Sequence, residues 1–161
     1  MRDVKRALLD ALRDQLRRDR DAAVATAKDA AAGATHEENR AEGDKDMRAT
    51  ESSYIARGQA ARVAELEEAI KRIDAIEIRD FDGDSPIGAS ALVDLEHAGK
   101  RTTYLVVTAG GGARVEAAGV SAQTLSTQSP LGRALVGLTE GDEAELAAPQ
   151  GKRTYEIVRV Y

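Results

Sequence analysis

The sequence contains no cysteine and no tryptophan, and only 3% of its 161 residues are aromatic. Without cysteine, neither a disulfide framework nor a thiolate metal site can form. So few large side chains are poorly suited to filling one compact core in a chain of this length. They suit a long, exposed pair of helices better, and the length also allows two small domains.

The sequence also has no long apolar run and no excess of positive charge. No stretch is long enough to span a membrane, and no apolar signal-peptide core follows Met1. The formal net charge of −5 argues against a nucleic-acid binder held mainly by phosphate contacts. We therefore expect a soluble, cytoplasmic protein that makes no membrane contact and meets nucleic acid only indirectly.

The first half of the chain has the periodicity of two helices. Residues 2–32 contain neither proline nor glycine, and their apolar residues recur every four positions. Residues 47–75 carry apolar residues spaced by three and four, as in the seam of a coiled coil. The first stripe consists of Val4, Leu8, Leu12 and Leu16, and the second of Val63, Leu66, Ile70 and Ile73.

The stretch between these helices reads as the reversal of an antiparallel coiled-coil hairpin. Residues 33–46 contain two glycines, interrupt the apolar periodicity and concentrate acidic side chains. The sequence therefore predicts a helical hairpin over residues 1–78, with an acidic tip near residues 33–46.

The acidic residues at the predicted tip suggest one chemistry and one plainer alternative. They are Glu37, Glu38, Glu42, Asp44 and Asp46. Carboxylates are hard oxygen ligands, and Mg²⁺ often takes only one or two of them while keeping bound water. Two such groups carried into another protein's active site could hold a second catalytic ion for phosphodiester cleavage. A solvated, charged loop is the alternative, and the residues alone leave both open.

After a turn-rich linker over residues 79–88, the sequence changes to strand patterns. Residues 89–161 are expected to form a small, mainly antiparallel sheet with one short helix packed on it. The last strand has apolar residues on both faces, with Tyr155 and Ile157 on one and Val158 and Val160 on the other, which favours a place inside the sheet. The strands are expected at residues 89–96, 101–108, 113–117, 123–127, 144–147 and 153–160.

The short helix is expected directly after Ser129. Ser129 can cap its start, Pro130 suits its first position, and Gly137 is well placed to end it in a left-handed conformation. Leu131, Leu135 and Val136 can lie together on its apolar face.

This part of the chain resembles a known family. Residues 129–137 read Ser-Pro-Leu-Gly-Arg-Ala-Leu-Val-Gly, residues 140–143 read Glu-Gly-Asp-Glu, and residues 151–158 read Gly-Lys-Arg-Thr-Tyr-Glu-Ile-Val. Their order and spacing resemble the C-terminal domain of the Gre (GreA/GreB) transcription factors. The resemblance covers residues 125–161 well and the first half of the chain in architecture. It implies an α+β fold, with a helical hairpin followed by an FKBP-like antiparallel β domain.

The resemblance also implies a function. Gre factors insert their hairpin into the secondary channel of bacterial RNA polymerase and assist the active site of the polymerase, so the chain would not be an enzyme itself. Their C-terminal domain contacts a coiled coil at the rim of the channel. The matching positions here are Ser129, Pro130, Leu131 and Gly132. The chain would be a monomer with no metal or cofactor of its own, and any Mg²⁺ would be shared with the polymerase.

The hairpin tip of Gre factors carries an Asp and, three residues later, a Glu followed by Asn. Glu38 and Asn39 match that Glu-Asn pair, and Thr35 then stands at the position of the Asp. In a second register Asp44 matches the family's Asp, and Met47 then stands at the position of the Glu. We rank Glu38 first as the functional tip acid, followed by Asp44, Glu37 and Glu42.

Three functions remain open from the sequence. The chain is a Gre-like factor that stimulates cleavage of backtracked transcripts, or it occupies the channel without stimulating cleavage and so regulates transcription. The third alternative is a helical-hairpin interaction module unrelated to polymerase. Polymerase binding separates the first two from the third, and transcript cleavage separates the first from the second.

Overall fold

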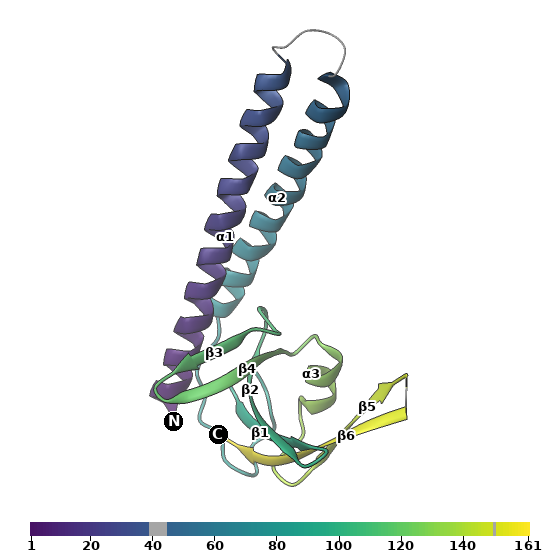
Figure 1. The fold of residues 1–161 in the computed structure, drawn as a ribbon. Helices are drawn as coiled ribbons and strands as arrows, with labels where there is room; N and C mark the ends of the chain where they lie inside the picture. The colour runs from purple at the N-terminus through teal and green to yellow at the C-terminus, as the bar shows by residue number, and fades with distance from the viewer. Residues whose placement is uncertain (39–44, 150) are drawn as a thin grey trace. The chain divides into compact units, whose positions relative to one another are not determined.

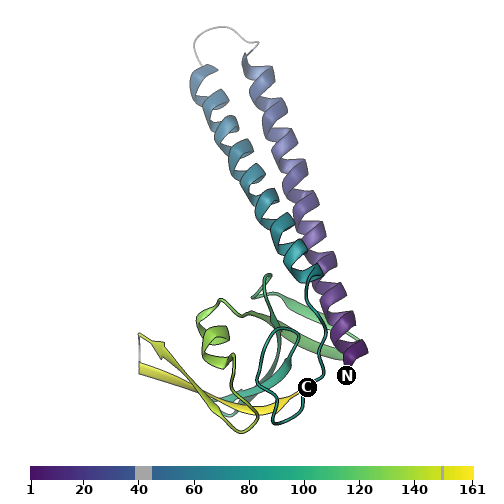
Figure 2. The ribbon, with the colours of Figure 1, turned by 180° about the vertical axis from the view of Figure 1, so that it is seen from behind.

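The computed structural model describes residues 1–38, 45–149 and 151–161, although for residues 34–38, 45, 46 and 48 it describes the backbone only. Figures 1 and 2 show the ribbon from opposite sides. The helices are α1 (Arg2–Glu38), α2 (Lys45–Asp74) and α3 (Pro130–Leu135). The strands are β1 (Leu92–His97), β2 (Lys100–Val107), β3 (Arg114–Ala117), β4 (Val120–Ser126), β5 (Glu143–Ala148) and β6 (Gly151–Val160).

The chain divides into two compact units. One consists of residues 15–70, and the other combines residues 1–14 with residues 71–161. Each long helix therefore contributes to both units, and the predicted linker at residues 79–88 stays a prediction. Within the second unit, Lys5 of α1 is hydrogen-bonded to Arg79, in the segment that follows α2.

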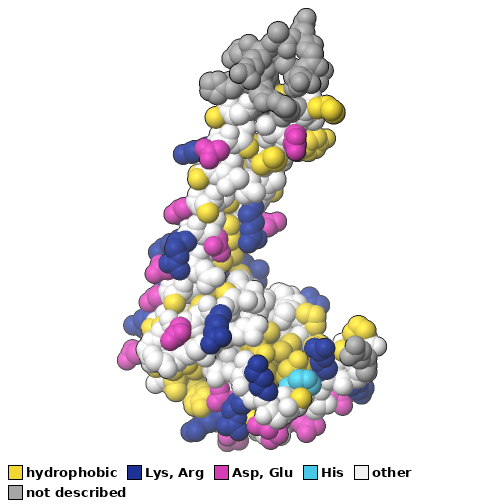
Figure 3. All heavy atoms as spheres, viewed as in Figure 1, with side chains coloured by type: hydrophobic (Ala, Val, Ile, Leu, Met, Phe, Trp, Pro, Cys, Tyr) yellow, Lys and Arg dark blue, Asp and Glu magenta, His cyan; other side chains and the backbone are white. Residues whose placement is uncertain are grey.

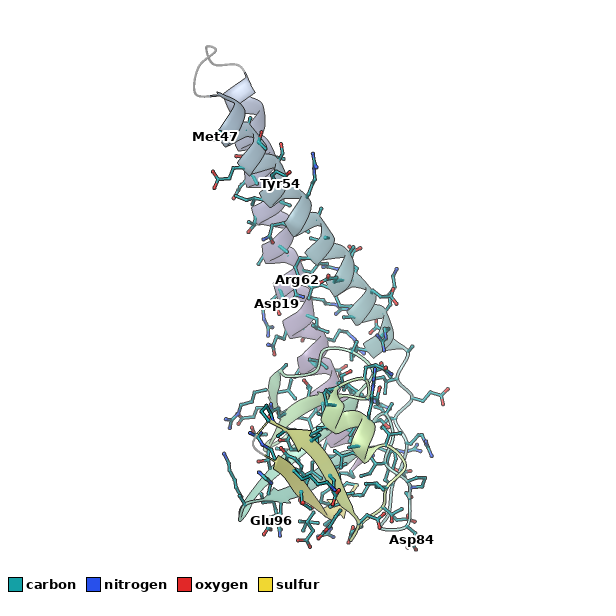
Figure 4. The ribbon with its side chains drawn as sticks, turned by 90° about the vertical axis from the view of Figure 1, so that its right-hand side faces the viewer. Asp19, Met47, Tyr54, Arg62, Asp84 and Glu96 are labelled. Carbon is teal, nitrogen blue, oxygen red and sulfur yellow. The ribbon has the colours of Figure 1, made fainter. Side chains whose placement is uncertain are left out.

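Within the unit of residues 15–70, α1 and α2 lie side by side as the two arms of a hairpin, and three views agree on this (Figures 1, 2 and 4). Leu16, Leu66 and Ile70 are buried, as their spacing predicted. The first helix ends later than predicted and continues through Gly33 to Glu38. A single glycine costs a helix only about 1 kcal/mol relative to alanine, too little to end a helix of this length.

The second unit contains one mixed sheet in the order β3-β4-β2-β1-β6-β5. Its pairings are antiparallel except for β2 with β4, which run parallel. The helix α3 packs on one face, where it shares a core with the sheet. Leu135 of α3 is fully buried in this core. The core also contains Ile87, Ala91, Val93, Leu95, Val106, Leu125, Ala144, Ile157 and Val160.

The last strand, β6, lies between β1 and β5, inside the sheet as predicted. The prediction for its two faces was wrong at one residue. Val160 pairs with Val93 and Ile157 with Leu95, so the register shifts between them and Val158 is the extra residue of a β-bulge. The bulge turns Val160 to the face of Ile157, and both lie in the core with α3.

The start of α1 is fixed by a buried lysine. Lys5 is fully buried, and its Nζ donates hydrogen bonds to the carbonyl oxygens of Arg79 (2.5 Å) and Tyr161 (2.9 Å). The same ammonium lies 4.7 Å from the centroid of the Phe81 ring. Burial lowers the pKa of Lys5 from 10.5 to about 8, although Asp80 opposes the shift. One side chain thus connects α1 with the linker and the C-terminal residue.

Candidate functional site

The tip acids predicted from the sequence lie largely outside the described structure. Glu37 and Glu38 are the last two residues of α1, and their backbone is helical. Their side chains, like all of Glu42 and Asp44, lie outside the described residues. Among the residues that the structure does describe, no three His, Asp or Glu side chains gather into a potential metal site. The roles of the tip acids therefore stay predictions.

The predicted contact segment is built around the start of α3. Ser129 is the N-cap, and its Oγ accepts a hydrogen bond from the Gly132 amide (3.1 Å) while donating one to the Ser126 carbonyl (2.7 Å). Pro130 takes the first helical position, where its missing N–H costs nothing. These contacts confirm the predicted cap and hold the first turn of α3 firmly against the end of β4.

Gly132 lies in this turn because only a glycine fits there. A Cβ atom at this position would lie 2.0 Å from the backbone oxygen of Ser126. The residue is buried, so its role is to allow close packing rather than to offer a surface for a partner. The predicted contact role of Gly132 stays a prediction, and the structure gives the residue a packing role within the fold.

The helix ends in the predicted left-handed glycine. Gly137 has φ of 91° and donates its amide to the carbonyl of Ile87 (2.9 Å). Beyond it, the Asp142 carboxylate accepts hydrogen bonds from the Thr139 amide (2.8 Å) and hydroxyl (3.0 Å). These bonds, led by the one from the amide, lower the pKa of Asp142. The whole segment from Ser129 to Asp142 is thus a fixed platform.

The platform exposes a different set of side chains from the predicted one. Pro130 is exposed, Ser129 is half-buried, and Leu131 is half-buried because it packs against the core. Val136, expected on the apolar face of the helix, is 46% exposed. It is the C-cap, and its ψ of 126° takes the chain out of the helix and turns the side chain away from the core. The sequence contained one indication of this exposure, because Val136 directly precedes Gly137, the residue expected to end the helix.

Arg133 adds a charge to this surface. It is exposed on α3, and its guanidinium lies 3.4 Å from the Gln128 side-chain oxygen. Pro130, Arg133 and Val136 are the exposed residues of the stretch 129–136, two of them apolar and one positively charged. We call these three residues the α3 patch.

A second exposed apolar surface lies on α2. Met47 is 86% exposed, Tyr54 67% and Ile55 46%. Met47 and Tyr54 are seven residues apart, about two helical turns, so they lie on the same side of α2. The Arg57 guanidinium lies 5.8 Å from the centroid of the Tyr54 ring. This surface borders the predicted tip.

Comparison with known proteins finds a similarity in the C-terminal part of the chain. Residues 86–161 match the family model "Transcription elongation factor, GreA/GreB, C-term". The chain is 35% identical over 100 residues to transcription elongation factor GreA of Hyphomonas neptunium and 36% identical over 100 residues to that of Rhodospirillum rubrum. Each alignment covers 62% of this chain and 60% of the relative. Over residues 86–161 the chain is therefore similar to the C-terminal domain of the GreA/GreB transcription elongation factors, and it spans about 60% of the length of these relatives.

Solved structures give a weaker likeness over more of the chain. The crystal structure of GreA factor homolog 1 (Gfh1) of Thermus thermophilus is 24% identical, with a TM-score of 0.39, over 94% of this chain and 95% of that one. A GreA/GreB elongation factor from Nitrosomonas europaea gives a TM-score of 0.37 at 21% identity, over 68% of this chain and 91% of that one. In the described part of the chain, no helix is both long and apolar enough to cross a membrane.

Proposed function

We propose that this chain is a transcription elongation factor that binds bacterial RNA polymerase through its secondary channel. The observation that carries the proposal is the match of residues 86–161 to the GreA/GreB C-terminal domain. The relatives aligned with the chain carry the name transcription elongation factor GreA. A paired helical arm precedes the matched domain, as the resemblance in sequence implied.

The dimensions of the arm suit such a role. α1 has 37 residues and α2 has 30, which correspond to about 55 Å and 45 Å at about 1.5 Å per residue, including the ends of both helices that belong to the other unit. Each helix is only about 10 Å wide with its side chains. A two-helix arm can therefore reach through a passage that would exclude a globular domain, and it carries the acids at its tip.

The α3 patch is the proposed contact with the rim of the channel. It is held in place by the Ser129 cap and the buried Leu135, so binding would order few additional groups. Val136 and Pro130 offer apolar area, and Arg133 offers a charge for an acidic partner surface. The proposed contact set differs from the one predicted from the sequence. Of the predicted residues, Gly132 has a structural role, and Leu131 packs partly against the core.

At the tip, we propose that Glu38 is the first acid to act, followed by Asp44, Glu37 and Glu42. Its carboxylate would share a Mg²⁺ ion with the polymerase, which would supply the other ligands. The chemistry would be hydrolysis of the transcript in the active site of the polymerase.

A factor that occupies the channel without stimulating cleavage is the second candidate, and one observation favours it. In the register that uses Asp44, the position of the family's Glu is held by Met47, whose side chain is 86% exposed and carries no charge. In the other register, Thr35 replaces the Asp. Neither side chain can bind Mg²⁺ as a carboxylate does.

A cleavage assay on a stalled, backtracked elongation complex tests the proposal and separates the candidates. A cleavage factor shortens the transcript in the presence of Mg²⁺, and Glu38→Ala abolishes this while polymerase binding stays nearly unchanged, because one exposed charge contributes little affinity. Glu67→Ala, at an exposed position of α2, is the control and keeps full activity. Binding without cleavage at every Mg²⁺ concentration selects the second candidate, and absence of binding contradicts both.

A further inference from the structure

The face of the sheet that carries α3 also holds an open cavity of about 730 Å³. Leu95 belongs to the core under α3, and the next residue on the same face of β1, His97, lines the cavity. Tyr104 of β2 and Gln123 of β4 also line it, and they are directly paired across the parallel strands. The size falls within the range of about 300–1,000 Å³ typical of small-molecule sites.

The charged residues among the described lining of the cavity are all cationic. Three cationic residues, Lys100, Arg101 and Arg114, line it, and no Asp or Glu is among its described lining residues. This is unexpected in a chain with a net charge of −5. The Arg114 Nε donates to the Ser121 hydroxyl (3.1 Å), which positions its guanidinium, and Arg101 lies 3.4 Å from Glu96. The cavity therefore favours an anion.

Aromatic rings form another part of the lining. The rings of His97 and Tyr155 stack with centroids 4.6 Å apart and planes 26° from parallel. His97 is held by a 2.8 Å hydrogen bond between Nδ1 and the Thr154 carbonyl. Because a carbonyl only accepts, Nδ1 carries a proton. Figure 3 shows the histidine side chain in cyan beside hydrophobic side chains, with Lys and Arg side chains close by.

We propose that this cavity is a binding site for a nucleotide, of the class of a nucleoside diphosphate. A planar base would pack against the Tyr104 and Tyr155 side of the cavity, and Lys100 and Arg114 would pair with the phosphates. Gln123 and Ser121 offer hydrogen-bonding groups between these two ends. The site goes beyond the proposed role in transcription and does not depend on it, since all of its residues lie in the β domain.

The test is a titration of the full chain with ADP and with GDP, followed by ¹⁵N NMR. We expect saturable shifts of amides in residues 100–104 and 121–123, with an affinity that falls as salt is added. Adenosine and inorganic phosphate, which each lack one half of the ligand, should bind at least about tenfold more weakly, a loss of about 1.4 kcal/mol.

Variants locate the site. Lys100→Gln and Arg114→Gln should each weaken diphosphate binding about fivefold to tenfold. Arg62→Gln makes the same change of charge on an exposed position of α2 and should leave the affinity unchanged (Figure 4). If Arg114→Gln disturbs the fold by losing its bond to Ser121, Lys100→Gln, at an exposed position, decides the matter.

Three results would overturn the proposal. The first is an absence of shifts in residues 100–104 and 121–123 at millimolar diphosphate. The second is equal binding of inorganic phosphate, which would indicate a simple anion site. The third is binding of an acidic peptide, such as oligoglutamate, at these residues with no response to either nucleotide, which would indicate a surface for a protein.

Discussion

At the scale of single residues, Lys5 and Gly132 show how local physical chemistry fixes the positions of larger parts. Lys5 is a buried cation whose hydrogen bonds go to two backbone carbonyls rather than to a carboxylate. Burial disfavours its charged form, which is why its pKa falls. Gly132 lets the backbone pack closely against Ser126 because it has no Cβ atom.

The lowered pKa of Lys5 predicts a specific dependence of stability on pH. Between about pH 8 and pH 10.5, the unfolded chain binds more protons at this lysine than the folded chain. The free energy of unfolding should therefore rise with pH across that window. Lys5→Met should remove this rise, whereas Lys71→Met, at an exposed position, should keep it. Urea unfolding at pH 7.5 and pH 10 measures the difference, and identical pH dependence in all three proteins would contradict it.

Gly132→Ala should destabilise the β domain by about 3 kcal/mol, because the new methyl group would overlap the Ser126 carbonyl and force the backbone apart. Gly58→Ala is the matched control, since a Cβ at Gly58 meets nothing within 4 Å. It should stabilise α2 by about 0.5–1 kcal/mol. Opposite signs in thermal unfolding are expected, and a neutral Gly132→Ala would show that the turn relaxes freely.

At the scale of elements, the hairpin depends on a short stretch of large side chains. Leu16, Leu66 and Ile70 are buried. Between these residues and the predicted tip, Ala23 is the one buried residue among the side chains described in α1 and α2. Alanine buries little area and therefore stabilises little. Among the described residues, the distal arm is accordingly expected to be the less stable part.

Leu66→Ala should cost about 2–4 kcal/mol, because the side chain is only 3% exposed and its loss leaves a cavity in the seam. Glu67→Ala, one residue further and exposed, should change stability by less than about 0.5 kcal/mol. Chemical denaturation followed by circular dichroism compares the two. Equal effects would mean that the heptad spacing does not define the packed face.

The sequence predicted these elements well wherever a single local rule decides the structure. The heptad spacing of Leu66 and Ile70, the Ser129 cap and the Gly137 end all follow from such rules. Prediction from the sequence failed where the local structure depends on residues distant in the chain. The residues around Val158 do not predict a bulge, because the register shift is set by the pairing of β6 with β1.

The surface of the α3 segment was predicted only in part, for a related reason, and its contact role stays a prediction. The motif located the α3 segment, but burial inside it depends on packing against the sheet. Leu131 contacts the core, and Val136, expected on the apolar face, is exposed. The cavity in the sheet is lined by Lys100, Arg114 and Tyr155 from three strands, and no spacing in the sequence connects them.

At the scale of the whole molecule, the proposed function divides into docking by the β domain and reach by the helical arm. Val136→Asp should weaken polymerase binding about tenfold, because it places an uncompensated charge in an apolar contact, while the fold is kept since Val136 is 46% exposed. Arg159→Gln, at an exposed position of β6, is the control and should bind as the wild type does. A pull-down with RNA polymerase compares the variants, and an unchanged Val136→Asp would remove the α3 patch as the docking surface.

The most direct test of the central claim is competition for RNA polymerase between this chain and a fluorescently labelled GreA, followed by anisotropy. Because both would use the secondary channel, the unlabelled chain should displace GreA completely as its concentration rises, whether or not it stimulates cleavage. Its Glu38→Ala variant should displace GreA equally well, since that charge serves chemistry rather than affinity. If GreA stays bound at saturating concentrations of the chain, the chain does not use the secondary channel and the account is wrong.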